Sequence, residues 1–180
     1  MRVRVAWPEE YAAVGELTVR AYRADGHGSP AYAERLRDAA GRAAAGLLLV
    51  ATAPVATDAA ELLLGTVALF PAGAEYAQLA GPGEMEIRML AVDPAARGLG
   101  AGAALAAACV QRAQDAGATG VRLSTEPAMT VAHRIYERLG FRRTPDRDWC
   151  PVPGATLLTY ALDLGDATLR RPGRTDVAAR

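Results

Sequence analysis

Clustered positive charge is absent from this sequence, although charged residues are common. The 20 basic and 20 acidic side chains give a formal net charge of zero at pH 7, and the basic residues form no long block. Because proteins bind the phosphates of nucleic acids through clustered Lys and Arg, we expect no nucleic-acid partner. The balance remains compatible with a local acidic groove that would receive an amine.

Long apolar runs are also absent. No stretch reaches the roughly 18 apolar residues that indicate a membrane span. Residues 1–8 lack the apolar segment of a secretory signal peptide. We therefore expect a cytoplasmic protein that does not associate with membranes.

Cysteine and histidine are scarce, with two of each. Cys109, Cys150, His27 and His133 do not have the spacing of zinc ligands, so we expect no metal site. A disulfide between the two cysteines stays open as an alternative. Two cysteines in a chain without a secretion signal more often stay reduced.

The residues that are present favour one globular domain of mixed α/β class. The 180 residues, 51% of them hydrophobic and 22% charged, suit a single domain with a buried core. Hydrophobic periodicity and turn residues predict the elements. We predict strands over residues 2–6, 47–53, 61–70, 84–92, 121–124, 141–143 and 156–164, and helices over residues 9–23, 31–45, 99–116 and 129–139. One domain over residues 1–164 and a disordered tail over residues 165–180 follow from this pattern.

The strongest local motif lies between a predicted strand and a predicted helix. It reads Arg97-Gly98-Leu99-Gly100-Ala101-Gly102. Glycines allow unusual backbone angles, and backbone N–H groups at a helix N-terminus bind anions. Arg97 adds a cation for phosphate. The motif predicts a pyrophosphate site, with a ligand-free tight turn as the alternative. The spacing matches neither a Rossmann dinucleotide fingerprint nor a Walker loop.

Two blocks together resemble the GNAT acyltransferase superfamily. Residues 90–102 are similar to its cofactor motif, Arg/Gln-x-x-Gly-x-Gly/Ala after a strand, with Arg97, Gly100 and Gly102 at the defining positions. Residues 132–141 are similar to its Ala-x-x-x-Tyr-x-x-x-Gly-Phe signature. The order of the predicted elements over residues 2–164 also fits that family.

The resemblance implies a three-layer α/β/α N-acyltransferase fold with a mixed sheet splayed between its fourth and fifth strands. It implies acetyl-CoA as co-substrate, with the pantetheine arm in the gap. Backbone groups of Leu90, Ala91 and Val92 would bind the acetyl and pantetheine portions. Those of Gly98, Leu99, Gly100, Ala101 and Gly102 would hold the pyrophosphate.

One position departs from the family pattern. Many members carry Asn three residues before the Ala of the second block, where it contacts the cofactor. This chain has Met129 there, followed by Thr130, which could replace the contact in part. The departure affects one cofactor contact and leaves the fold prediction unchanged.

Tyr136 and Glu86 are the candidate catalytic residues. Tyr136 matches the family tyrosine near the cofactor sulfur, and a phenol can protonate a leaving thiolate. The alternative is a packing tyrosine on a helix face. Strict alternation along the strand places Glu86 on the same face as Leu90 and Val92. There Glu86 could act as the base, directly or through water.

The base role of Glu86 has two alternatives. Glu86 could be a surface residue paired with Arg88 or Arg122. An ordered water could also take the proton without it.

Further polar residues fall in segments that border the acceptor site in the family. His27 lies in a glycine-rich turn and His133 lies one helical turn before Tyr136. Asp146, Asp148 and Trp149 precede the last strand, where an aromatic ring and carboxylates would suit a cationic amine. A solvated loop is the alternative for His27, Asp146, Asp148 and Trp149, and an exposed position on its helix is the alternative for His133.

The sequence thus favours an N-acetyltransferase that acts on a primary amine of a small molecule or peptide through a ternary complex. Four alternatives stay open: a non-catalytic acyl-CoA sensor, a partner-binding protein without CoA, a longer acyl chain and a hydroxyl acceptor. The segments that would define the acceptor carry no motif of known mechanism. Many relatives form dimers, so a homodimer is compatible with the resemblance.

Overall fold

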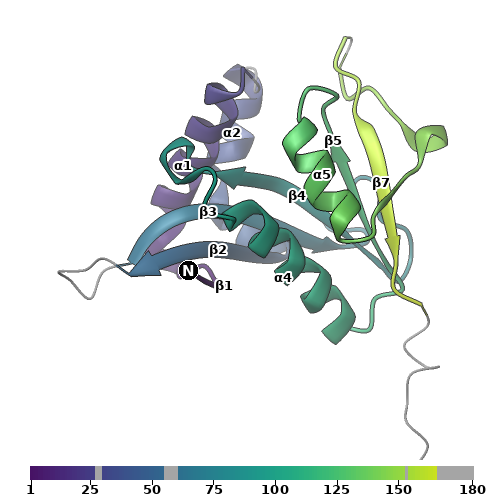
Figure 1. Cartoon of the computed structure of the whole chain (residues 1–180), viewed down its shortest axis with the longest axis horizontal. Coiled ribbons are helices and arrows are strands. Elements are labelled where there is room, and N and C mark those ends of the chain that lie inside the picture. The colour runs from purple at the N-terminus through teal and green to yellow at the C-terminus, as the bar shows by residue number, and fades with distance from the viewer. Residues whose placement is uncertain (27–29, 55–60, 153, 166–180) are drawn as a thin grey trace, which may run out of the picture.

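A single mixed sheet runs through the computed structural model, which describes residues 1–26, 30–54, 61–152 and 154–165 (Figure 1). The strand order is β1-β2-β3-β4-β5-β7-β6. All neighbours are antiparallel except β4 and β5, which are parallel. The strands are β1 Arg2–Val5, β2 Leu47–Pro54, β3 Glu61–Pro71, β4 Glu84–Val92, β5 Gly120–Thr125, β6 Arg142–Arg143 and β7 Leu158–Asp163.

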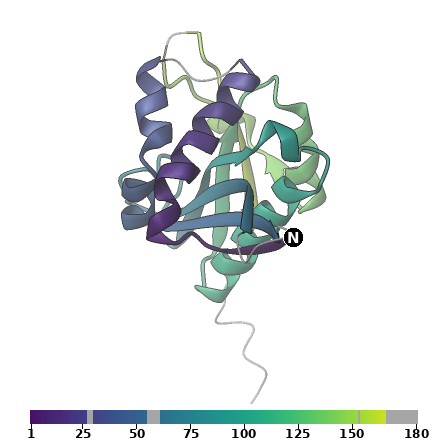
Figure 2. The same ribbon diagram turned by 90° about the vertical axis from the view of Figure 1, so that its left-hand side faces the viewer.

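Helices cover both faces of this sheet, as Figure 2 shows. They are α1 Tyr11–Ala24, α2 Pro30–Arg37, α3 Ala39–Ala45, α4 Ala101–Asp115 and α5 Thr130–Arg138. One apolar cluster joins α1, α2 and α3 to the sheet and includes Val14, Leu36 and Phe70. Another lies under α4 and α5 and includes Leu105 and Tyr136. This arrangement confirms the predicted mixed α/β, three-layer α/β/α fold.

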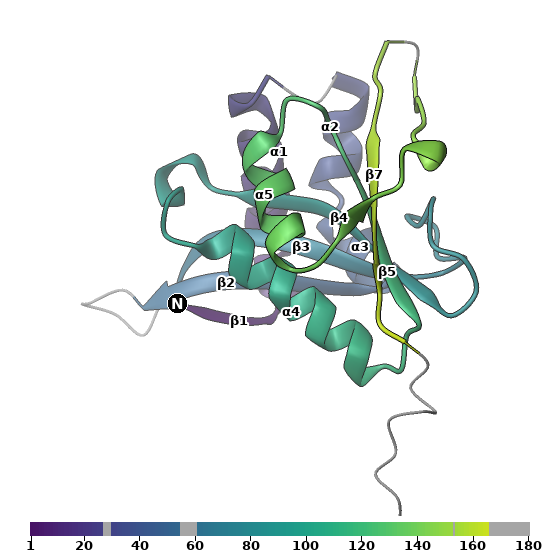
Figure 3. The same cartoon turned by 45° about the vertical axis from the view of Figure 1, so that its right-hand side comes forward.

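The strands β4 and β5 pair along only part of their length. Pairing runs from Glu84 with Gly120 to Ile87 with Leu123. Beyond Ile87, β4 continues to Val92 with no partner strand on that side among the described residues, and the two strands run apart (Figures 1 and 3). The splay implied by the resemblance is therefore present. Buried backbone N–H and C=O groups need partners, so the freed edge of β4 is ready to bind another extended molecule.

A β-bulge lies in this freed half of β4. Thr66 of β3 pairs with Ala91 and Ala68 pairs with Arg88, so two steps along β3 match three along β4. Met89 lies within the bulge with a φ of 52°, a left-handed value that is rare for a residue other than glycine. An extra residue of this kind reverses the side-chain alternation.

The bulge corrects the predicted faces of β4. Glu86 pairs with Phe70, whose ring belongs to the cluster under α1, α2 and α3. Leu90 and Val92 pack instead against the cluster under α4 and α5. Glu86 therefore lies on the opposite face from Leu90 and Val92, and the prediction of a shared face was wrong.

The predicted helix over residues 31–45 is divided in two at Asp38. The Asp38 side chain accepts a hydrogen bond from the Gly41 N–H and caps α3. Its other oxygen accepts a 2.5 Å hydrogen bond from the Tyr76 hydroxyl. Asp38 is held by a residue far along the chain, which local periodicity does not register.

The remaining sequence predictions concern His27, the C-terminal tail, the two cysteines and membrane spans. His27 and residues 166–180 of the predicted tail lie outside the described residues. Cys109 is buried, Cys150 is exposed, and both are free thiols. None of the helices within the described ranges is long and apolar enough to cross a membrane.

Candidate active site

The glycine motif forms an open turn that leads into α4. Gly98 has a φ of 81° and Gly100 a φ of 82°, which side chains strongly disfavour. A Cβ at either residue would meet no atom within 4 Å, so the space above the turn is open. Gly100 is the N-cap of α4 and supplies no side-chain cap. The first N–H groups of α4 are therefore available to an anion.

Arg97 of this turn is held by the end of α1. Its guanidinium forms two contacts of 3.0 Å with the two carboxylate oxygens of Asp25. A second ion pair, 2.6 Å from Arg20 to Asp93, joins the same helix to the same loop. Both side chains of the Arg97–Asp25 pair are nearly half exposed. Sequence reasoning gave no indication of Asp25, because it lies 72 residues from its partner.

The freed edge of β4 lies directly beside the glycine turn. A Cβ added to Gly102 would lie 3.4 Å from Val92 Cγ2 and 3.7 Å from Leu90 Cδ2. The residues Leu90, Ala91 and Val92 thus lie next to the uncapped start of α4. One extended ligand can therefore contact both features.

Tyr136 of α5 is buried beside the same region. Its ring lies 5.9 Å from that of Phe141 and 6.2 Å from that of Tyr160. Its hydroxyl makes no hydrogen bond within the described part of the chain. Burial is the main cause that raises the pKa of Tyr136, so the phenol keeps its proton at neutral pH and can donate it.

Glu86 is fully buried, and its carboxylate is already occupied. Oε2 accepts hydrogen bonds of 2.6 Å from the N–H groups of Gln78 and Leu79 and of 3.2 Å from that of Ala80. Oε1 lies 3.1 Å from the Arg88 guanidinium. These contacts hold the 71–83 loop against β4, a structural task that the sequence did not reveal.

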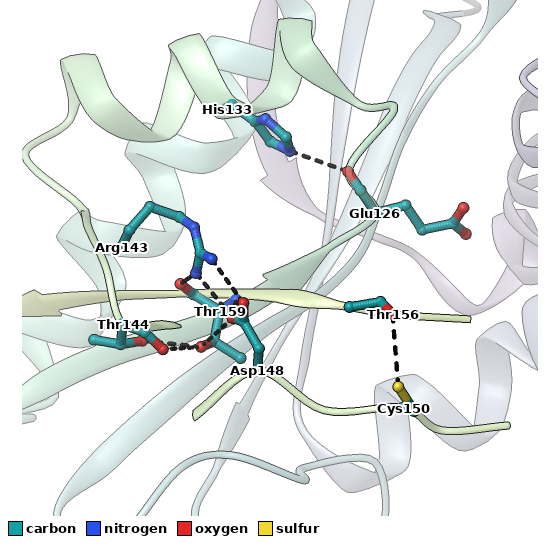
Figure 4. A network of polar contacts seen from close by, with 8 residues as sticks. All are labelled: Glu126, His133, Arg143, Thr144, Asp148, Cys150, Thr156 and Thr159. Atoms are coloured by element: carbon teal, nitrogen blue, oxygen red, sulfur yellow. Dashed lines mark hydrogen bonds and ion pairs between the residues drawn. The ribbon is translucent and has the colours of Figure 1, made fainter. Parts of the chain in front are cut away.

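The segment before β7 is fixed by a polar network (Figure 4). The Arg143 guanidinium donates to both carboxylate oxygens of Asp148, at 2.9 and 2.7 Å. The Thr159 N–H also donates to Asp148, at 2.8 Å. The Arg143 hydrogen bond is the main cause that lowers the pKa of Asp148 to about 2. Asp148 is therefore engaged within the protein, which makes it a poor free partner for an amine.

The other candidates near this network have separate surroundings. Asp146 is exposed. The Trp149 Nε1 is buried without a partner within the described residues. His133 Nε2 lies 3.0 Å from the Glu126 carbonyl oxygen (Figure 4).

Met129 and Thr130 mark the departure from the family pattern. Met129 is the N-cap residue of α5 and provides no side-chain cap. Its sulfur accepts a 3.4 Å contact from the Thr125 hydroxyl. Thr130 is exposed at the first turn of α5, so its hydroxyl is accessible.

A pocket of about 460 Å³ lies on the α1 side of the glycine turn. It is bordered by α1, by the start of β3, and by the loop residues Asp93 and Leu99. Tyr136, Leu90 and Val92 are not among its lining residues, so this pocket is separate from the freed edge of β4. Among the described residues, no three or more His, Cys, Asp or Glu side chains gather in a group that could hold a metal ion.

The geometry thus combines an uncapped helix N-terminus, an unpaired strand edge and a buried phenol. The first suits a pyrophosphate, the second suits amide groups of an extended arm, and the third can supply a proton. These are the parts that transfer of an acyl group from a phosphate-bearing thioester requires.

Comparisons with known proteins point the same way. A model of the acetyltransferase (GNAT) family matches residues 11–141. An uncharacterized N-acetyltransferase of Schizosaccharomyces pombe is 32% identical over 104 residues, which span 58% of this chain and 60% of that protein. This chain therefore matches less than two thirds of that relative.

Solved structures share the fold. A GNAT acetyltransferase from Brucella melitensis in complex with acetyl-CoA has a TM-score of 0.61 and 24% identity, covering 91% of this chain and 88% of that one. The ribosomal-protein-S18-alanine N-acetyltransferase from Escherichia coli has a TM-score of 0.65 and 17% identity, covering 97% of both chains.

Proposed function

Because the chain belongs to the acetyltransferase (GNAT) family, we propose that it transfers an acetyl group from acetyl-CoA to a primary amine. The acceptor is a small molecule or a peptide, and it attacks directly within a ternary complex. One observation carries the proposal: the uncapped N-terminus of α4 lies beside the freed edge of β4. A phosphate-bearing ligand with an extended amide arm fits both.

The residues present suit acetyl-CoA. The N–H groups from Gly98 to Gly102 would hold its pyrophosphate, since the turn is open and the helix is uncapped. Arg97 would add a charge-assisted contact. Backbone groups of residues 90–92 would align the pantetheine arm along the strand. When bound, acetyl-CoA supplies the activated acyl group.

Tyr136 would act as the general acid and Glu86 as the general base. The Tyr136 phenol would donate its proton to the departing sulfur, which its burial favours by keeping it protonated. Glu86 would take the amine proton through water, because donors from the protein surround its own oxygens. A water molecule acting without Glu86 is the alternative base.

The acceptor would be an amine, and the resemblance to the family implies that it enters beside the early helices and the segment before β7. The Escherichia coli neighbour acts, by its name, on an alanine of a ribosomal protein, so the first panel of candidate acceptors to be assayed consists of peptides with a free α-amine. The second panel consists of small primary amines. A homodimer would leave this chemistry unchanged, because the residues invoked here all come from one chain.

Calorimetric titration with acetyl-CoA tests the proposal. The native chain should bind it with micromolar affinity, and an Arg97→Ala/Gly100→Val double variant should lose that binding. Acetyl-pantetheine, which lacks the pyrophosphate, should bind weakly to both proteins. Thiol release with the two amine panels then identifies the acceptor. Absence of acetyl-CoA binding by the folded native chain would refute the proposal.

A further inference from the structure

A buried arginine on α3 has no ionic partner. Arg42 has no exposed surface, and no ion pair is formed by it among the described residues. Its guanidinium donates to Met89 Sδ and to the Thr18 hydroxyl, each at 3.3 Å. Its Nε has no hydrogen-bond partner at all within the described ranges.

The contrast with Arg4 makes this unusual. Arg4 is also buried, yet its guanidinium contacts the carboxylates of Glu10 at 2.6 Å and Glu61 at 2.7 Å and lies over the Trp7 ring. Taking a charge out of water is costly unless it is paired. Burial lowers the pKa of Arg42, but a guanidinium keeps its proton in proteins. Arg42 therefore remains a buried, unpaired positive charge.

No carboxylate contacts the Arg42 guanidinium directly within the described ranges. The side chains of Tyr22, Tyr32 and Tyr76 lie close enough to Arg42 to affect its pKa. The Asp38 carboxylate also affects the pKa of Arg42, but its oxygens accept hydrogen bonds from the Tyr76 hydroxyl and from the Gly41 N–H.

Arg88 of β4, by contrast, has a carboxylate partner. Arg88 contacts the Glu86 carboxylate at 3.1 Å. Arg42 differs from Arg88 in that no carboxylate contacts its guanidinium among the described residues.

That point is the bulge of β4. Met89, which Arg42 contacts, carries the left-handed φ of 52°. It directly precedes Leu90 in the freed half of the strand, where the acyl group would bind. The Arg42 guanidinium thus contacts the side chain of the residue that immediately precedes Leu90.

We propose that Arg42 is a positioning residue for acyl transfer: it holds the Met89 bulge, and its charge stabilises the negative charge that develops on the thioester carbonyl oxygen. The inference rests on the proposed function. In that reaction the amine nitrogen forms a bond to the carbonyl carbon while the C=O π pair moves to oxygen. The pair returns as the C–S bond breaks. The amine proton passes to the base, and the sulfur takes the Tyr136 proton. A fixed charge near the oxygen favours this path.

The test compares Arg42→Met with Arg42→Lys and with Arg4→Met as a matched loss of a buried arginine. Arg42→Met should lower kcat about 10- to 100-fold, with the acetyl-CoA dissociation constant within about twofold. Arg42→Lys keeps the charge only below a pKa that burial lowers, so at the low end of the pH range it should be faster than Arg42→Met and should lose this advantage as the pH rises. Arg4→Met should leave the rate of its folded fraction unchanged.

Two readouts do not depend on turnover. The C=O stretch of bound acetyl-CoA, isolated by ¹³C-edited infrared spectroscopy, should move to higher frequency in Arg42→Met, because the polarising charge is gone. The melting temperature of ligand-free Arg42→Met should equal or exceed that of the native chain, because an unpaired buried charge is replaced by an apolar group. A purely structural arginine predicts a lower melting temperature and no change in the stretch.

Several outcomes would overturn the inference. These are an unchanged kcat and stretch in Arg42→Met, or an Arg42→Lys variant as slow as Arg42→Met at every pH, including the low pH at which a buried lysine is charged. If Arg42→Met does not fold, Arg42→Gln takes the same test, and failure of both to fold would establish a structural role instead. If the native chain binds no acetyl-CoA, the proposed function itself fails, which calorimetry distinguishes from these outcomes.

Discussion

The ion pair between Arg97 and Asp25 predicts that a substitution raises the affinity for acetyl-CoA: Asp25→Asn should bind it more tightly than the native chain. Asp25 now holds the guanidinium that is proposed to contact phosphate. Removing the carboxylate frees that guanidinium and also removes a negative charge from the neighbourhood of an anionic ligand. Both effects favour the complex.

The size of the gain follows from the exposure of the pair. Ion pairs whose partners are about half exposed, as these are at 44% and 45%, contribute about 0.2–1 kcal/mol. Since 1.36 kcal/mol corresponds to a tenfold change, we expect a rise in affinity of about 1.4- to fivefold. The rise should shrink at high salt, because the Debye length is about 3 Å at 1 M.

Calorimetric titration at low and high salt measures this effect. Asp115→Asn is the control, since it makes the same charge change at the opposite end of α4, about 20 Å away along the helix axis. In an Arg97→Ala background, Asp25→Asn should raise the affinity for acetyl-CoA by less than it does in the native chain. A double-mutant cycle measures this difference. Weaker or unchanged binding by Asp25→Asn would show that Arg97 does not exchange Asp25 for phosphate.

Three further predictions concern single side chains. Tyr136→Phe should lower kcat about 100-fold in a thiol-release assay, with acetyl-CoA affinity and melting temperature nearly unchanged; a wild-type kcat would contradict the acid role. Glu86→Gln should lower the free energy of unfolding by about 2 kcal/mol in urea titrations, because backbone donors lose a charged acceptor. An unchanged pH–rate profile in its folded fraction would exclude Glu86 as the base. Asp148→Asn should cost about 1–2 kcal/mol of stability at pH 7. Because the folded pKa is lowered from 3.8 to about 2, the wild-type advantage exists above the unfolded value and should disappear as the pH falls toward 2; a pH-independent difference would contradict this reasoning.

The elements of this fold were predictable because their signals are local. Glycine and proline punctuation and hydrophobic periodicity locate the strands and helices to within a few residues. The glycine motif likewise identifies the uncapped start of α4, since Gly98 and Gly100 adopt the left-handed angles that only glycine accepts readily.

What failed depends on contacts between distant segments. Strict alternation placed Glu86 with Leu90, but the bulge at Met89 is set by the register between β3 and β4. Arg42 sits in an alanine-rich stretch with no motif, and only the packing of α1, α3 and β4 shows that its guanidinium is buried. No spacing rule along the chain reports such a contact.

The bulge at Met89 also divides β4 into two stretches with opposite mutational tolerance. Glu86 and Arg88 face the α1–α3 layer before it, whereas Met89 and Ala91 do so after it. Along β4, positions that tolerate polar substitutions should alternate with positions that do not, and this alternation should move by one residue at Met89. Removing one residue there would bring both stretches into a single phase and restore continuous pairing with β3. For β4, the number of residues is thus a stricter constraint than their hydrophobicity.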